Sequence, residues 1–90
     1  MKKLENIPKV VSLEHKNGVY LFKLGKLLHE SDISLNQFIL DTETEYKVIS
    51  KYIYGDVVAK IDMNVIAKIC FYFQCGIEEV IEFVPKKKLV

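Results

Sequence analysis

The stretch from Ser34 to Gly55, SLNQFILDTETEYKVISKYIYG, decides the fold of this 90-residue chain. Ser34 has the chemistry of a helix N-cap, and Gln37, three residues later, would complete a capping box. A short helix is predicted from there to about Thr42 and, after a two-residue turn, a second helix over 45–54. Gly55 is well suited to end that second helix, because glycine adopts the left-handed conformation without strain.

Two short helices joined in this way have the layout of a helix-turn-helix, whose second helix enters the major groove of DNA. The apolar residues of the second helix repeat at helical spacing and are expected to face the core: Val48, Ile49, Tyr52 and Ile53. Its opposite side is expected to present Tyr46, Lys47, Ser50 and Lys51. Any amphipathic surface helix has a charged outer side, so the pattern alone leaves a merely solvated face open.

The segment before this motif predicts a β-hairpin followed by a helix. Asn17-Gly18 lies between β-branched and aromatic runs, and both residues tolerate the positive φ angles of a tight hairpin turn. From about Tyr20 the leucines recur at helical spacing, and Ser31-Asp32 is expected to end this helix.

The segment after the motif predicts two more helices. Asp62 is expected to cap the first, in which the apolar residues from Val65 to Phe73 form a continuous stripe. Phe71, Tyr72 and Phe73 are expected to lie mostly in the core, with one or two of the aromatic residues available for a dimer interface. Gly76 interrupts the pattern, and a short fifth helix is predicted over 78–83, where two glutamates in the first turn suit the helix dipole.

Composition indicates one small cytoplasmic domain. Half of the residues are hydrophobic, yet no apolar run is long enough to span a bilayer, and no signal-peptide pattern is expected at the N-terminus. Cys70 and Cys75 lack the further ligands of a zinc site, so both are expected to be small buried side chains in a reducing compartment. His15 and His29 are expected at the surface. No constellation of nucleophile, base and orienting acid is present, so no enzymatic activity is expected.

The charge pattern argues against an easy assignment to DNA binding. The net charge is +1 and every basic residue is a lysine. Residues 1–18 carry +2 and residues 19–85 carry −4, whereas Lys86, Lys87 and Lys88 add +3. Duplex binding normally rests on a basic face. The three terminal lysines are more typical of a solubilising tail than of a phosphate clamp.

The helix-turn-helix segment resembles the Cro/repressor-type family of phage repressors and xenobiotic-response-element regulators. The features that carry this resemblance are Ile33-Ser34, Phe38-Ile39, Ile49, Tyr52 and the closing Gly55. The later stretches IDMNVIAKIC (61–70) and VIEFVP (80–85) are similar to one branch of that family. The resemblance covers 24–85 and leaves 1–19 outside.

This resemblance implies an all-α, five-helix, lambda-repressor-like domain, to which the Asn17-Gly18 pattern adds a short N-terminal β-hairpin extension. The expected division is an extension over 1–19, a DNA-binding domain over 20–85 and a basic tail over 86–90. Family members bind operator DNA as dimers, so double-stranded DNA and a second copy are the expected partners, with no cofactor, metal or membrane. Carried over by position, the DNA-binding candidates are Asn36 and Gln37, whose amides would hold a phosphate, and Glu45, Tyr46, Lys47, Ser50 and Lys51, which would read bases.

Two functions are therefore weighed. The first is a sequence-specific transcriptional regulator, expected to be a repressor of phage or mobile-element type, encoded by a bacterium or phage and associated with the nucleoid when bound. The second is a protein-interaction module that keeps the fold but binds another regulator instead of an operator. Its motivation is the acidic core and three departures from the family pattern: Leu35, Glu43 and Asp56.

Overall fold

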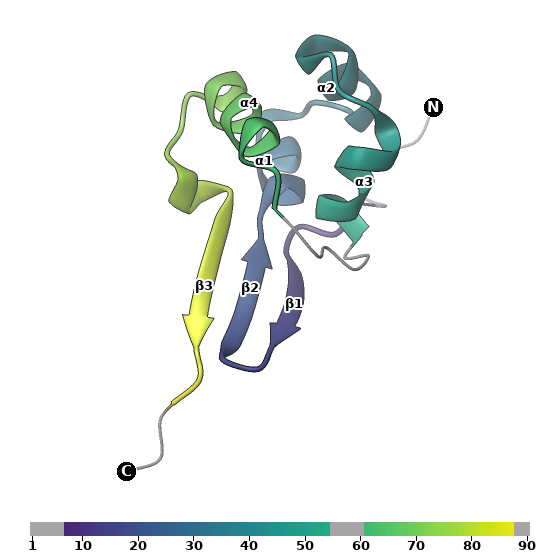
Figure 1. Ribbon diagram of the computed structural model, residues 1–90. Coiled ribbons are helices and arrows are strands. Elements are labelled where there is room, and N and C mark those ends of the chain that lie inside the picture. Colours follow the sequence, from purple (N-terminus) through teal and green to yellow (C-terminus); the bar gives the residue numbers. More distant parts are fainter. Residues whose placement is uncertain (1–6, 55–60, 88–90) are drawn as a thin grey trace.

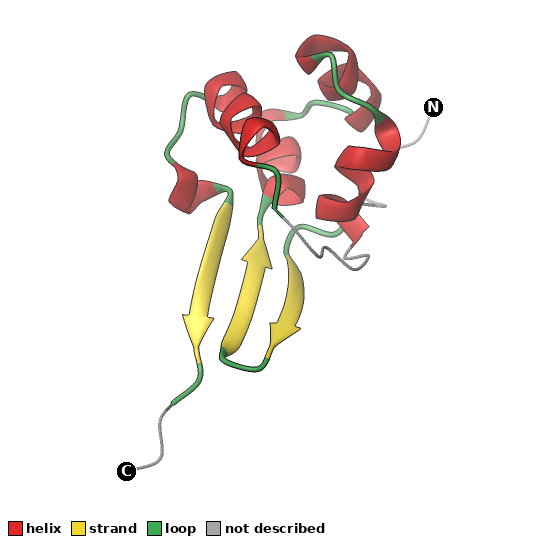
Figure 2. Ribbon diagram, viewed as in Figure 1, coloured by secondary structure: helices red, strands yellow, loops and turns green. Residues whose placement is uncertain are grey.

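The computed structural model describes residues 7–54 and 61–87. A cluster of helices sits at one end of a three-stranded sheet, and the strands extend away from it (Figures 1 and 2). The α-helices are α1 (Leu24–Ser31), α2 (Leu35–Thr42), α3 (Tyr46–Tyr54) and α4 (Met63–Phe73). The strands are β1 (Val11–His15), β2 (Gly18–Phe22) and β3 (Ile81–Pro85), and a short 3-10 helix spans Ile77–Glu79.

The sheet is antiparallel and has β2 at its centre. β1 and β2 form the hairpin that Asn17-Gly18 predicts, with His15 opposite Gly18. β3 pairs with the other side of β2, so that Leu13, Tyr20 and Phe83 lie in one row across the three strands. The hairpin is therefore built into one sheet with the last strand of the chain.

The predicted all-α, five-helix architecture is wrong. The described residues contain four α-helices, and the segment expected as a fifth helix over 78–83 is divided between the 3-10 helix and β3. Val80, Ile81, Phe83 and Val84 are β-branched or aromatic and fit a pleated sheet. Residues 81–85 pair with β2 along one side of the strand, and this tertiary contact outweighs the helical preference of the two glutamates.

The predicted helix boundaries are confirmed where a side-chain cap marks them. The Ser34 hydroxyl accepts a hydrogen bond from the amide of Gln37 (3.1 Å), and the Asp62 carboxylate accepts one from the amide of Asn64 (2.9 Å). The predicted capping box also requires the Gln37 side chain to bond back to the backbone amide of Ser34. That half of the prediction is wrong, because the Gln37 side chain instead donates to Asp41 (2.7 Å). α1 begins at Leu24 and not near Tyr20, since Tyr20 belongs to β2.

The core lies between the helices and the adjoining end of the sheet. Its fully buried side chains are Phe22, Leu24, Leu28, Phe38, Ile49, Ile53, Ile66, Ile69 and Val80. Phe22 meets Tyr52 of α3 edge to face, with ring centroids 5.6 Å apart. The expected core position of Phe71 is wrong, since 78% of this residue is exposed, whereas Tyr72 and Phe73 are half-buried beside Phe38.

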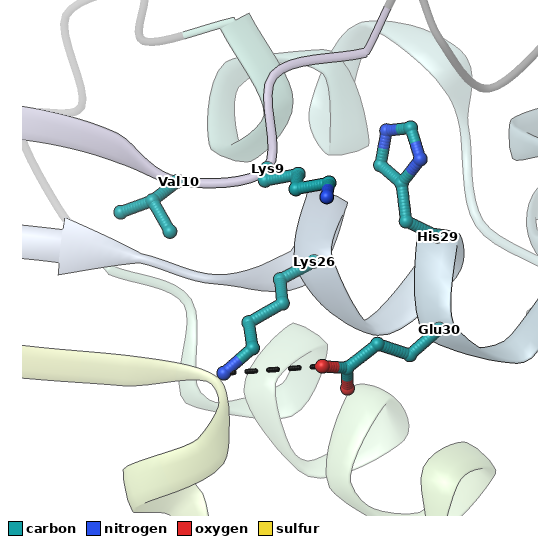
Figure 3. Close-up of a pocket in the computed structure, with 5 residues that line it drawn as sticks. All are labelled: Lys9, Val10, Lys26, His29 and Glu30. Carbon is teal, nitrogen blue, oxygen red and sulfur yellow. Dashed lines mark ion pairs between the residues drawn. The ribbon is translucent and has the colours of Figure 1, made fainter.

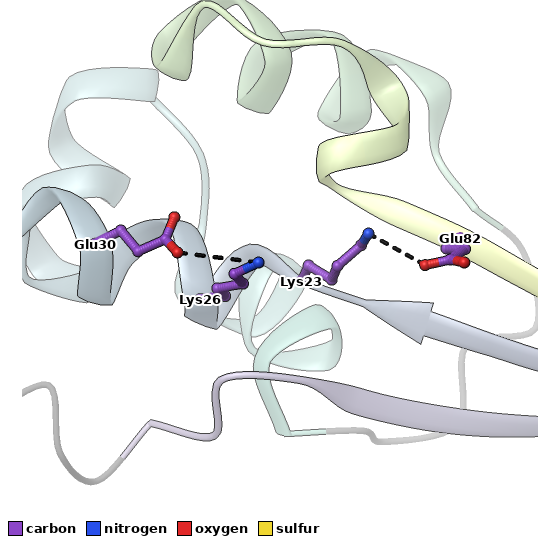
Figure 4. A network of polar contacts seen from close by, with 4 residues as sticks. All are labelled: Lys23, Lys26, Glu30 and Glu82. Atoms are coloured by element: carbon purple, nitrogen blue, oxygen red, sulfur yellow. Dashed lines mark hydrogen bonds and ion pairs between the residues drawn. The ribbon is translucent and has the colours of Figure 1, made fainter.

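α1 is the element that joins the helices to the sheet. The amide of Lys23 donates to the carbonyl of Val80 (2.7 Å), and the amide of Lys26 donates to the carbonyl of Lys9 (2.8 Å). The ammonium of Lys23 also reaches Glu82 of β3 at 3.2 Å, while Lys26 pairs with Glu30 within α1 (Figure 4). Segment 7–9 crosses α1 at Gly25, so closely that a Cβ there would lie 1.8 Å from the carbonyl oxygen of Pro8.

Candidate nucleic-acid interface

α3 presents a polar and aromatic face to solvent. Tyr46, Lys47, Lys51 and Tyr54 are exposed, and 55% of Tyr46 is accessible. Ile49, Tyr52 and Ile53 on the other side are buried, as their spacing predicts. Because long side chains with hydrogen-bond donors extend from one side of a short helix, this face can reach the edges of bases in a groove.

The turn between α2 and α3 is braced by its own hydrogen bonds. Glu43 ends α2 in the left-handed conformation (φ 55°, ψ 45°) that glycine normally supplies, and thus keeps the turn geometry at the cost of strain. The amide of Thr44 donates to the carbonyl of Ile39 (3.2 Å). Thr42 donates to the carbonyl of Phe38 (2.7 Å), and its hydroxyl also contacts that of Thr44 (2.9 Å). These hydrogen bonds fix the backbone at the end of α2, two residues before α3 begins.

The beginning of α2 offers fewer free donors than expected. Asn36 and Gln37 are both exposed. However, the amide of Gln37 is bonded to Ser34, and its side chain is bonded to Asp41. Asp41 also accepts a hydrogen bond from the hydroxyl of Tyr72 (2.5 Å) on α4. Gln37 thus caps α2 through its amide and contacts Asp41, which links α2 to α4. A phosphate could bond to the amide of Gln37 only by displacing the Ser34 hydroxyl.

Two tyrosines border the exposed face of α3. Burial raises the pKa of Tyr54 above its ordinary value of 10.0, and the neighbouring Tyr46 phenol raises it further. Both causes favour the protonated hydroxyl of Tyr54. Near neutral pH this face therefore carries a phenolic hydrogen-bond donor beside the lysine ammonium groups.

A family model described as the Cro/C1-type HTH DNA-binding domain matches residues 23–86. The chain belongs to this family. No curated protein and no solved structure matches the chain significantly. The Cro/C1-type domain is a DNA-binding regulatory domain and not an enzymatic one, so the protein is a DNA-binding regulator. The match begins after β2 and includes β3, so the sheet joins strands from inside and outside the matched region.

On this Cro/C1-type domain, α3 and the residue before it bring most of the predicted base-reading residues together. Glu45, Tyr46, Lys47 and Lys51 are all exposed. The expectation that Ser50 faces outward is wrong, since only 9% of it is accessible and its hydroxyl bonds to the carbonyl of Lys47 (3.4 Å). A serine side chain is too short to extend past its longer neighbours on the helix.

Sequence reasoning overlooked Tyr54 on this face. Tyr54 stands eight residues after Tyr46, about two helical turns, so the spacing could have identified it. Gly55, expected to close α3, and Asp56, one of the family departures, lie outside the described residues.

A pocket of about 450 Å³ lies between residues 9–10 and α1 (Figure 3). Lys9, Val10, Lys26, His29 and Glu30 line it, and none of these is a serine, threonine or cysteine. His29 is half-buried, not fully at the surface as expected, because its Nε2 lies 2.8 Å from the carbonyl of Ile7. The pocket thus lies where segment 7–10 packs against α1.

The remaining candidate sites are structural. The thiols of Cys70 and Cys75 are free and half-buried, and burial raises the pKa of Cys75. Among the residues that the structure describes, no three His, Cys, Asp or Glu side chains are grouped to hold a metal ion. No helix in the described ranges is long and apolar enough to cross a bilayer.

Proposed function

We propose that the protein is a sequence-specific repressor of phage or mobile-element type that reads the major groove with α3 as a homodimer. The observation that carries the proposal is the exposed face of α3 within a Cro/C1-type domain. Lys47 and Lys51 can donate to guanine O6 and N7, and Tyr46 can contact a thymine methyl group. Glu45 can accept from cytosine N4, and the exposed Asn36 can contact a neighbouring phosphate.

A homodimer follows from the small footprint of a single recognition helix. α3 has nine residues and is therefore about 13 Å long, which covers only a few base pairs. Two copies related by a twofold axis would place two α3 helices about 34 Å apart in successive major grooves. Such pairing doubles the number of bases that are read and requires a roughly palindromic site.

The proposal is tested by selecting random duplexes with the purified protein and measuring the affinity of the enriched sequence. We expect a palindromic motif with half-sites one helical turn apart. Lys51→Ala should weaken binding to this motif by about 1–3 kcal/mol, with a much smaller loss on unrelated DNA. Lys68→Ala is the matched control, because Lys68 is an exposed lysine on α4, outside α3.

Equal losses for the two variants would contradict base reading by α3. Absence of an enriched motif would contradict the sequence-specific function altogether, and the exposed faces of the helices would then be examined as surfaces for a partner regulator.

A further inference from the structure

The far end of the sheet gathers lysines from two distant segments. Lys16 lies in the hairpin turn, and the amide of Lys86 donates to the carbonyl of Asn17 (2.9 Å). This hydrogen bond places the beginning of the C-terminal basic run beside the turn. Lys16, Lys86 and Lys87, here called the basic tip, are all exposed, and none forms an ion pair with another described residue. The solubilising tail expected from sequence is thus attached to a structured element.

The basic tip is held in place by close packing. At Gly18, the first residue of β2, an added Cβ would lie 2.3 Å from the carbonyl oxygen of Val84, so the strand that follows the turn lies directly against β3. On one face of the sheet Tyr20 packs on Phe83, with ring centroids 4.8 Å apart, and His15 meets both rings edge to face. The lysines therefore project from a braced end of the sheet.

One edge of the sheet, formed by β1, extends from the side of the molecule that carries α3. β1 contacts α3 and lies beneath it in Figure 1, whereas β3 lies beneath α4. A strand of five residues is roughly 16 Å long, which equals about five base pairs along a duplex. DNA bound to α3 and running along the sheet would therefore have phosphates within reach of the tip.

The distribution of charged residues favours binding of a polyanion at the basic tip over binding along the acidic helices. Residues 24–54 and 61–80 carry four lysines and eight acidic residues, a net charge of −4. Residues 14–19 and 84–87 at the tip carry three lysines and a single glutamate. Because non-specific affinity for duplex DNA depends on neutralised phosphates, the acidic helices need a basic contact elsewhere.

We propose that the basic tip contacts the phosphate backbone of the duplex whose bases α3 reads. This inference rests on the proposed function and adds a second contact, which positions the protein without reading sequence. Lys16 and Lys86 supply the two phosphate contacts nearest to the hairpin turn, and Lys87 extends them.

The test compares the Lys16→Ala/Lys86→Ala double variant with the Lys9→Ala/Lys68→Ala double variant, which has the same net charge. Each full-length protein is titrated with the selected duplex, either as the minimal site or with ten further base pairs on each side. On the long duplex we expect the tip variant to lose about two per protomer, and therefore about four per homodimer, in the slope of log K against log salt, together with about tenfold in affinity. Its preference for the selected site over unrelated DNA should be unchanged.

On the minimal site the tip variant and the wild type should bind almost equally, and the control variant should keep the wild-type slope on both duplexes. Equal losses for the two double variants, or no gain by the wild type from the longer duplex, would overturn the proposal. Normal DNA binding by the tip variant, together with lost binding to phosphatidylserine vesicles, would assign the tip to a lipid surface instead. A wild type without preference for any duplex would instead show that the proposed function has failed.

Discussion

The helices and the sheet of this protein carry opposite charge. The helical residues 24–54 and 61–80 have a net charge of −4, whereas residues 7–23 and 81–87, in and beside the sheet, carry five lysines and two glutamates, a net charge of +3. The net charge of the whole chain, +1, hides this division. An acidic helix-turn-helix is compatible with DNA binding if base contacts and phosphate contacts lie on different elements.

The joint between the two regions is the most sensitive part of the fold. Gly25→Ala would place a methyl group 1.8 Å from the backbone carbonyl of Pro8, and neither backbone can move without loss of the hydrogen bond between Lys26 and Lys9. We expect a loss of about 3 kcal/mol in the free energy of unfolding, measured by urea titration. Gly76→Ala is the control, because the three atoms nearest to the new methyl group belong to the movable carboxylate of Glu78. Equal stability of the two variants would show that segment 7–9 does not pack on α1 as described.

The helical region can be stabilised without changing the sheet. Glu43→Gly should raise the free energy of unfolding by about 1 kcal/mol, because glycine adopts the left-handed conformation of this residue without a Cβ penalty. Glu43→Ala removes the same charge but keeps the Cβ, and it should give little or no gain. A similar gain for both variants, again by urea titration, would mean that charge and not backbone strain limits the turn.

The smallest effect is expected for the contact between α2 and α4. The hydrogen bond from Tyr72 to Asp41 is the main cause that raises the pKa of Tyr72 above 10.0, and burial adds to it. The folded state thus favours the protonated phenol, so this stabilisation is complete below pH 10 and is lost as pH rises through the raised pKa. Tyr72→Phe should therefore show a shallower loss of stability between pH 9 and 11 than the wild type. If the stability of Tyr72→Phe and of the wild type fell in parallel with pH, the hydrogen bond between Tyr72 and Asp41 would be contradicted.

Local signals made most of the helical region predictable. Ser34 and Asp62 are caps that act within a few residues, and α2 and α4 begin where these caps predict. The pairing of β3 with β2 joins residues about 60 positions apart, so no local pattern could indicate it, and the glutamates before β3 favoured a helix. For the same reason the approach of Lys86 to Asn17, and hence the basic tip, could not be foreseen.

The exposed face of α3 was also largely predictable, since amphipathic spacing identified Tyr46, Lys47 and Lys51. Ser50 was wrongly predicted to be exposed, because helical spacing indicates the direction of a side chain and not its length. The bonds of Gln37 to Ser34 and Asp41 depend on rotamers that a sequence pattern does not specify. The side-chain partners of a cap or interface residue therefore depend on packing that the sequence pattern does not describe.

The most direct test of base reading by α3 is a nuclear magnetic resonance titration of the ¹⁵N-labelled full-length protein with the selected duplex. We predict the largest amide shift changes at 45–51, with smaller changes at Lys16 and Lys86. Residues 68–72 of α4, which include the exposed Lys68 and Phe71, should stay unchanged. Large changes at 68–72 with none at 45–51 would contradict the account, because the duplex would then bind a face of the protein other than α3.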